Sequence, residues 1–216
     1  MSRSRLLVST LALALACVSQ AHGAELSPVT KQTGLPRTPE QLAVSFEHAD
    51  LGFKVIPDQR RIEGDATLTF KAISPLQALV VDLDPEYAVS RVEVDGKPVA
   101  REVWQNPEGR MRVTLPRQVP AGASVKLRVV YAGQPHVAKR APWDGGFVWA
   151  TAPTGEPWVA SAIQGEGCDL LWPCIDHPQG EPALVDEHIT VPAPLVAPGN
   201  GAVSYTHLTL PTIYSV

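Results

Sequence analysis

The segment that decides the fold is residues 158–178, which read WVASAIQGEGCDLLWPCIDHP. An apolar strand pattern at 158–163 ends at the amide Gln164, and a tight Gly-x-Gly turn follows at 165–167. The Trp-Pro-Cys-x-Asp-His-Pro run then predicts a sharp corner, because proline cannot continue a regular ladder. Another apolar pattern follows at 189–191. The segment therefore predicts two strands joined by a structured but irregular connection.

Strands are also predicted upstream, where apolar and polar residues alternate with a period of two. The clearest case is Arg61–Ala72, whose inward positions are Ile62, Gly64, Ala66, Leu68 and Phe70. Shorter alternating stretches are 42–46, 51–55, 111–115, 125–131 and a pair at 147–150 and 158–163. Residues 79–83 are almost entirely apolar, so we expect a strand covered on both faces.

Turn signals separate these stretches at regular intervals. Asp95-Gly96 is typical of a two-residue type I′ hairpin. Other turns are predicted at 57–59, 106–109, 120–122 and 154–155. No helical periodicity is found after the first residues of the chain. The pattern therefore predicts an antiparallel all-β domain.

Composition narrows the class of protein. The chain has 216 residues, of which 44% are hydrophobic and 19% charged, which is typical of a globular domain. Its formal net charge is −4, and no cluster of Lys or Arg occurs. We therefore expect neither a nucleic-acid partner nor an anionic membrane surface as a partner.

The N-terminus has the features of a signal peptide. Arg3 and Arg5 precede an apolar run at 6–18, and Ala21-His22-Gly23 supplies small residues for cleavage. The apolar run is too short to span a bilayer comfortably. We expect residues 1–23 to be removed and the chain to be exported to the periplasm or the extracellular space. A lipoprotein anchored through Cys17 is the less favoured alternative.

Two cysteines, Cys168 and Cys174, would remain in the exported chain. An oxidising compartment permits a disulfide between them. With only five intervening residues, we favour Cys174 as a buried unpaired thiol over a disulfide. A zinc site formed by both cysteines with Asp176 and His177 is disfavoured, since the spacing matches no usual ligand pattern.

The central segment resembles the N-terminal domain of the aminopeptidase N family of zinc metallopeptidases. In that family a Gln or Glu lies ten positions before the Cys of a Pro-Cys-x-Asp corner, as Gln164 and Cys174 do here. Residues 142–149, PWDGGFVW, resemble the lead-in of secreted bacterial members. The resemblance covers roughly 42–201. It implies a saddle-like antiparallel β-sandwich, incomplete at its C-terminus, and a role in removing N-terminal residues from peptides.

The family's catalytic motifs do not occur in this sequence. The family's chemistry requires His-Glu-x-x-His on a helix plus a later Glu, and also a Gly-x-Met-Glu-Asn strand. The histidines, none of which are spaced in that way, are His22, His48, His136, His177, His188 and His207. The resemblance therefore implies that zinc and the catalytic residues belong to a catalytic domain in cis. We expect this chain alone to bind no metal and to be inactive.

The resemblance also assigns residues that contact the peptide substrate. By position, Gln164 would contact the free amino end of a peptide through its carboxamide oxygen. Gly165 would let the backbone approach the peptide closely. Asp176 is expected to cap its own turn by an Asx-type bond. The family often has Lys after the corner, where this chain has Glu181-Pro182, so no local ion pair is carried over.

Four tryptophans surround the central segment: Trp143, Trp149, Trp158 and Trp172. We expect them to fill the core of the corner rather than to stack on a substrate.

The predicted domain organisation is a signal peptide at 1–23, an extended lead-in at 24–41, a β-sandwich at 42–202 and a tail at 203–216. The tail resembles a translated sequencing adapter and is set aside as non-native. Two functions compete. One is the substrate-seating domain of an exported zinc aminopeptidase, and the other is a secreted β-sandwich binding module with no enzymatic activity.

Overall fold

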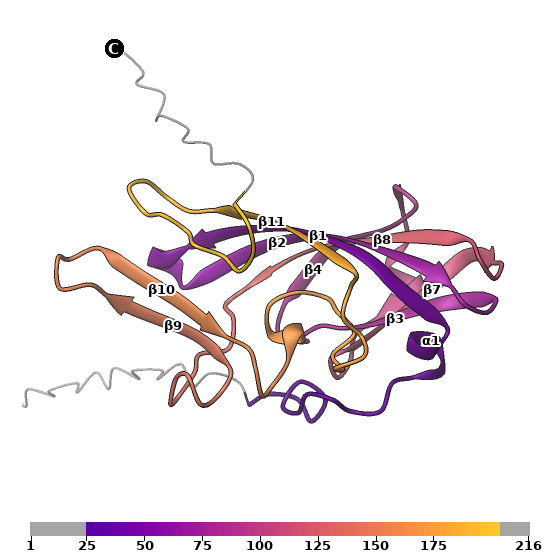
Figure 1. Cartoon of the computed structure of the whole chain (residues 1–216), viewed down its shortest axis with the longest axis horizontal. Coiled ribbons are helices and arrows are strands. Elements are labelled where there is room, and N and C mark those ends of the chain that lie inside the picture. The colour runs from indigo at the N-terminus through magenta and orange to yellow at the C-terminus, as the bar shows by residue number, and fades with distance from the viewer. Residues whose placement is uncertain (1–24, 204–216) are drawn as a thin grey trace, which may run out of the picture.

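The computed structural model describes residues 25–203, and these form a mostly β structure (Figure 1). The predicted signal peptide and nearly all of the predicted tail lie outside the described residues. Within 25–203 no helix is long and apolar enough to cross a membrane. The all-β prediction is confirmed, since α1, at Pro39–Leu42, is the sole α-helix among the described residues.

The larger sheet has six strands in the order β11-β1-β2-β8-β4-β5. Their bounds are Leu184–Thr190, Val44–Ile56, Arg61–Ala72, Ser124–Gly133, Ala88–Val94 and Lys97–Pro98. All neighbours pair antiparallel except β11, which runs parallel to β1. The β2 bounds match the predicted strand, and all five of its predicted inward residues are buried.

The first strand differs from its prediction in continuity rather than in its buried face, since Phe46, Leu51 and Phe53 all lie inward as the alternation at 42–46 and 51–55 predicts. Two short strands were expected, whereas β1 is continuous and carries a β-bulge between Phe46 and His48. The bulge places one extra residue in β1, so the buried positions change from even to odd numbers along the strand. The alternation at 42–46 predicts Leu42, Val44 and Phe46 on the inward face, and this is wrong for Leu42. Leu42 is 53% exposed, because Thr38 caps α1 with a capping box and turns this segment into a helix.

A second sheet, of order β3-β7-β6, packs against the larger one. Its strands are Leu76–Asp82, Arg110–Val119 and Trp104–Gln105. The core between the sheets includes Leu68 and Leu127 from the larger sheet and Met111 and Val113 from the smaller one. Burial of each such aliphatic side chain stabilises the fold by about 1.5–3 kcal/mol. Every residue of 79–83 is buried, as predicted for a strand covered on both faces.

A separate hairpin of β9 (Gly146–Thr151) and β10 (Pro157–Ala162) extends to one side of the sandwich in Figure 1. Short 3-10 turns complete the structure: η1 at Pro57–Gln59, η2 at Arg101–Val103 and η3 at Cys168–Leu170. The type I′ hairpin is confirmed, since Asp95 and Gly96 both have positive φ, of 50° and 74°. The β9–β10 hairpin then leads directly into the segment that the sequence singled out.

A candidate substrate-binding turn

Gln164 lies in an exposed turn directly after β10. The turn is closed by the Gly167 N–H, which donates to the Ile163 carbonyl at 2.8 Å. Gly165 and Gly167 have φ values of 114° and 122°, which side chains other than glycine rarely adopt. The sequence therefore needs both glycines to turn the chain here, and the result is an amide side chain presented to solvent.

Three contacts from distant parts of the chain hold the turn. The Thr33 N–H donates to the Gly165 carbonyl at 3.4 Å. The Glu166 carboxylate accepts a hydrogen bond from the Gly145 N–H. Gly167 packs directly on the Asp176 carboxyl group, so closely that a Cβ atom at Gly167 would overlap it. The lead-in, the loop before β9 and the corner thus all fix the position of this turn.

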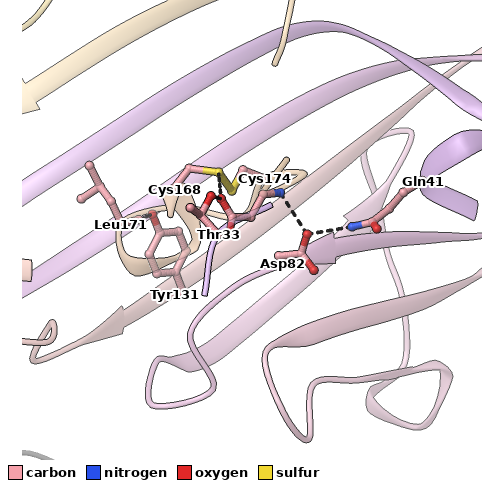
Figure 2. Close-up of a disulfide and its surroundings, with 8 residues drawn as sticks. Thr33, Gln41, Asp82, Tyr131, Cys168, Leu171 and Cys174 are labelled. Atoms are coloured by element: carbon pink, nitrogen blue, oxygen red, sulfur yellow. Dashed lines mark hydrogen bonds between the residues drawn. A yellow bond between two sulfur atoms is a disulfide. The ribbon is translucent and has the colours of Figure 1, made fainter. Parts of the chain in front are cut away.

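Cys168 and Cys174 form a disulfide, with the sulfurs 1.97 Å apart and the Cα atoms 6.2 Å apart (Figure 2). Our preference for an unpaired Cys174 is therefore wrong. The 3-10 turn η3 folds the intervening residues back, so the short spacing closes rather than separates the two side chains. Cys174 is nonetheless buried, at 1% exposure, as expected. The disulfide also excludes the zinc site considered for these two cysteines.

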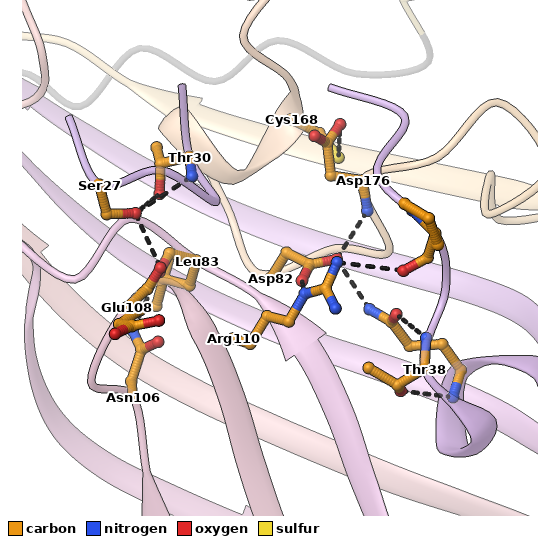
Figure 3. Close-up of polar contacts among 12 residues, drawn as sticks. Ser27, Thr30, Thr38, Asp82, Leu83, Asn106, Glu108, Arg110, Cys168 and Asp176 are labelled. Carbon is orange, nitrogen blue, oxygen red and sulfur yellow. Dashed lines mark hydrogen bonds and ion pairs between the residues drawn. The ribbon is translucent and has the colours of Figure 1, made fainter. Parts of the chain in front are cut away.

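The corner after the disulfide is fastened to the end of β3 (Figure 3). Asp82 and Cys174 exchange two backbone hydrogen bonds, of 2.7 and 2.9 Å. The Asp82 carboxylate also accepts bonds from the Asp176 N–H at 3.0 Å and from the Gln41 amide at 2.7 Å. Burial raises the pKa of Asp82, and these hydrogen bonds with the charge of Arg110 offset part of that rise. A single buried carboxylate therefore ties β3, α1 and the corner together.

Asp176 does not cap its own turn, so that prediction is wrong. An Asx turn needs a backbone N–H two residues on, and Pro178 has none. The Asp176 carboxylate instead accepts a bond from the Thr33 hydroxyl at 2.8 Å. Asp176 thus connects the corner to the lead-in and, through Gly167, to the candidate turn.

Asp169 is a buried acid that the sequence did not reveal. It is fully buried, and within 25–203 neither of its carboxyl oxygens has a hydrogen-bond partner of good geometry, although the nearby Thr30 side chain acts to lower its pKa. Burial, with the negative charge of Asp176 adding to it, raises the pKa of Asp169 to about 8. The group is therefore a neutral acid at neutral pH, which removes the cost of burying an unpaired charge. The burial of Asp169 depends on residues distant in the chain, so it could not be inferred from the sequence around position 169.

The core-filling prediction for the tryptophans holds for only two of them. Trp149 and Trp172 pack against the main core. Trp143 and Trp158 are 85% and 61% exposed, so the prediction is wrong for these two.

The described residues offer no metal site. Within 25–203 no three His, Cys, Asp or Glu side chains are arranged to hold a metal ion. The residues present therefore do not fit a zinc ion, and the chemistry available at the candidate turn is hydrogen bonding by the Gln164 amide and by exposed backbone groups.

Comparison with solved structures identifies the kind of domain. An M1 zinc metallopeptidase from Deinococcus radiodurans is 30% identical, with a TM-score of 0.56 over 76% of this chain and 36% of that chain. A structure of this metallopeptidase bound to a Tyr-Ser-Ala substrate gives 26% identity, a TM-score of 0.54 and the same coverage. Yeast leukotriene A4 hydrolase with bestatin shares the fold, at 19% identity and a TM-score of 0.54 over 75% and 26% of the two chains.

The present chain spans about a third of the length of the Deinococcus metallopeptidases. No protein-family model and no curated protein sequence matches it. The Gln-to-Cys spacing, the β-sandwich and these structural matches agree with one another. The β domain at 25–203 is therefore similar to the N-terminal domain of M1 zinc metallopeptidases, in agreement with the resemblance found in the sequence.

Proposed function

We propose that this domain seats the amino end of a peptide at the Gln164 turn, as part of an exported zinc-dependent aminopeptidase. The observation that carries the proposal is that Gln164 is exposed on a turn held by three separate segments. A binding group on such a support loses little conformational freedom when a ligand arrives, which favours affinity.

The role of Gln164 follows from its chemistry. Its carboxamide oxygen can accept a hydrogen bond from a peptide ammonium group, and it stays uncharged at every physiological pH. Gly165 has open space where a Cβ atom would lie, so a peptide backbone can approach the turn closely. Gln164 is neither a general base nor a metal ligand here, so the domain binds and orients the substrate.

Hydrolysis by the proposed enzyme would require zinc in a catalytic domain in cis, since within 25–203 no three His, Cys, Asp or Glu side chains are placed to bind a metal ion. We expect the 216-residue chain to release no product from an aminoacyl-anilide, with or without added zinc. Zinc-dependent hydrolysis by this chain would contradict the proposal.

Peptide binding tests the role of Gln164 directly. Binding of a tripeptide with a free amino end to the full chain should exceed that of its acetylated form, since acetylation removes the ammonium group. Gln164→Ala should abolish this difference, while Gln77→Ala, at an exposed position of β3, should preserve it. Equal binding of both peptides to the unaltered chain would overturn the proposal.

Export is the second part of the proposal. It is supported by the signal-peptide pattern at 1–23 and by the Cys168–Cys174 disulfide, since disulfides persist in oxidising compartments. Cell fractionation should find the chain in the periplasm or the medium, cleaved near residue 23. Recovery of an uncleaved chain from the cytoplasm would exclude export.

A further inference from the structure

The loop before β9 and the Gln164 turn lie at the same end of the β9–β10 hairpin. Gly146 pairs with Ala162 in the antiparallel register, so the residues before Gly146 lie beside those after Ala162. Figure 1 shows both connections at the end of the hairpin nearest the sandwich. The hydrogen bond between the Gly145 N–H and the Glu166 carboxylate joins them. A side chain at Gly145 would overlap that carboxylate, so the glycine permits this contact.

Internal hydrogen bonds fix the backbone conformation of the loop before β9. The Asp144 carboxylate accepts hydrogen bonds from the N–H groups of Lys139 at 2.7 Å and Arg140 at 2.6 Å. The Trp143 N–H donates to the Arg140 carbonyl at 2.9 Å. Trp143 is therefore part of a hydrogen-bonded turn only two residues from the contact with Glu166.

Trp143 is the most exposed large apolar side chain among the described residues, at 85% exposure. A single exposed apolar residue is ordinary on a protein surface. Here, however, the indole belongs to a closed turn that directly contacts the turn bearing Gln164. Trp158 provides a comparison within the same hairpin. It is also exposed, but it pairs with Ala150 near the hairpin's own turn, away from Gln164.

The charges around Trp143 select among ligands that an indole ring can bind. Indole rings stack on aromatic groups and also attract cations. The exposed basic residues Lys139 and Arg140 lie within four positions of Trp143. The carboxylates of Asp144 and Glu166 beside them balance their charge. The loop therefore has no excess negative charge to attract a cationic side chain, and stacking on an aromatic ring is the contact that it leaves to the indole.

We propose that Trp143 determines specificity by stacking on an aromatic side chain near the amino end of a peptide bound at Gln164. This inference rests on the proposed function and adds a substrate class to it: peptides with an aromatic residue at position one or two. Each side chain would act on a different part of the peptide, Gln164 on the amino end and Trp143 on the side chain.

Fluorine NMR of the full chain labelled with 5-fluorotryptophan can separate the two contacts. Phe-Ala-Ala, Ala-Phe-Ala and Ala-Ala-Ala would be titrated, each with a free and an acetylated amino end. We expect the Trp143 signal, assigned by its loss in Trp143→Ala, to shift with a peptide that contains Phe. The Trp158 signal should stay in place. Trp143→Ala should reduce the preference for Phe by about three- to tenfold, and Trp158→Ala should leave it unchanged.

The outcomes distinguish this inference from the proposed function. A preference for Phe that survives Trp143→Ala overturns the inference, even if Gln164→Ala removes discrimination between free and acetylated ends. A stronger preference for Ala-Lys-Ala than for Ala-Phe-Ala also overturns it. Equal binding of free and acetylated peptides by the unaltered chain overturns the role of Gln164. Absence of a Trp143 shift with every peptide overturns this inference alone, because a peptide can bind at Gln164 without contacting Trp143, whereas absence of binding by every peptide overturns both.

Discussion

The ring of Tyr131 lies directly over the α-carbon of Gly64. The two residues are paired across β2 and β8, and a Cβ atom at Gly64 would overlap the ring. The Tyr131 hydroxyl passes on to donate to the Leu171 carbonyl at 2.6 Å. The missing side chain of Gly64 therefore allows a sheet residue to reach across to the segment between the disulfide cysteines.

Gly64→Ala should destabilise the domain by about 1–3 kcal/mol, the usual cost of overpacking a core. The Tyr131 ring cannot move aside easily, because it is buried and its hydroxyl is hydrogen-bonded to the Leu171 carbonyl. It also packs edge-on against the Tyr87 ring, with the two ring centroids 5.1 Å apart. Urea unfolding would measure the change. Gly52→Ala is the matched control, since a Cβ atom there lies 3.4 Å from its nearest neighbour, and an equal loss in both variants would contradict the packing argument.

Reduction of the Cys168–Cys174 disulfide should also destabilise the domain, by on the order of 2 kcal/mol for so short a loop. The disulfide spans the segment whose Leu171 carbonyl accepts from Tyr131. Unfolding midpoints with and without a reductant would show the difference. In Cys168→Ala the reductant should have no effect, and a persistent effect in that variant would exclude the disulfide as its cause.

Gly167→Ala should disturb the Gln164 turn more than Gly165→Ala. Both positions have positive φ, so both substitutions strain the backbone by about 1 kcal/mol or more. Only at Gly167 would the methyl group also overlap the Asp176 carboxyl group, whereas at Gly165 the space is open. Amide hydrogen exchange at residues 163–167 measures the loosening. Equal exchange in the two variants would mean that the Asp176 contact does not hold the turn.

The neutral Asp169 should make stability depend on pH in a defined window. Its carboxyl group keeps a proton in the folded state up to about pH 8, while the unfolded group loses it near the ordinary value of 3.8. The contribution of Asp169 to the free energy of unfolding is thus fully present below about pH 4 and decreases as the pH rises to about 8. Asp169→Asn cannot ionise, so the decrease should be smaller in that variant.

Urea unfolding at pH 5 and pH 8.5 would test this, with Asp58→Asn as an exposed control. Burial also raises the pKa of Asp82, Asp84 and Asp176, so some dependence of the same sign should remain in Asp169→Asn. An unchanged dependence on pH in Asp169→Asn would show that Asp169 is ionised in the folded protein.

The sheets were predictable where a strand is regular and has one buried face. In β2 the alternation of apolar and polar residues gave both the bounds and the inward side chains. In β1 the same reasoning found the buried residues on both sides of the bulge, but it divided one continuous strand into two because the bulge interrupts the alternation. The parallel pairing of β11 likewise depends on residues more than 130 positions away.

The site was predictable as a local motif but not as a set of contacts. The glycines around Gln164 indicated a tight turn, and in the structure Gly165 and Gly167 both have positive φ. The groups that hold this turn come from Asp176 in the same segment and from Thr33 and Gly145, which lie further away in sequence. The burial predicted for Trp143 was also wrong, because a tryptophan in an apolar stretch can be either buried or exposed.

The parallel pairing of β11 with β1 affects how the chain is made. His48 of β1 pairs with Leu184 of β11, so one edge of β1 stays without its neighbour until nearly the whole domain has been synthesised. An unpaired edge is a template for pairing with other chains. During synthesis and any passage through a translocon, β1 is therefore the strand whose unpaired edge a holdase chaperone would most need to cover.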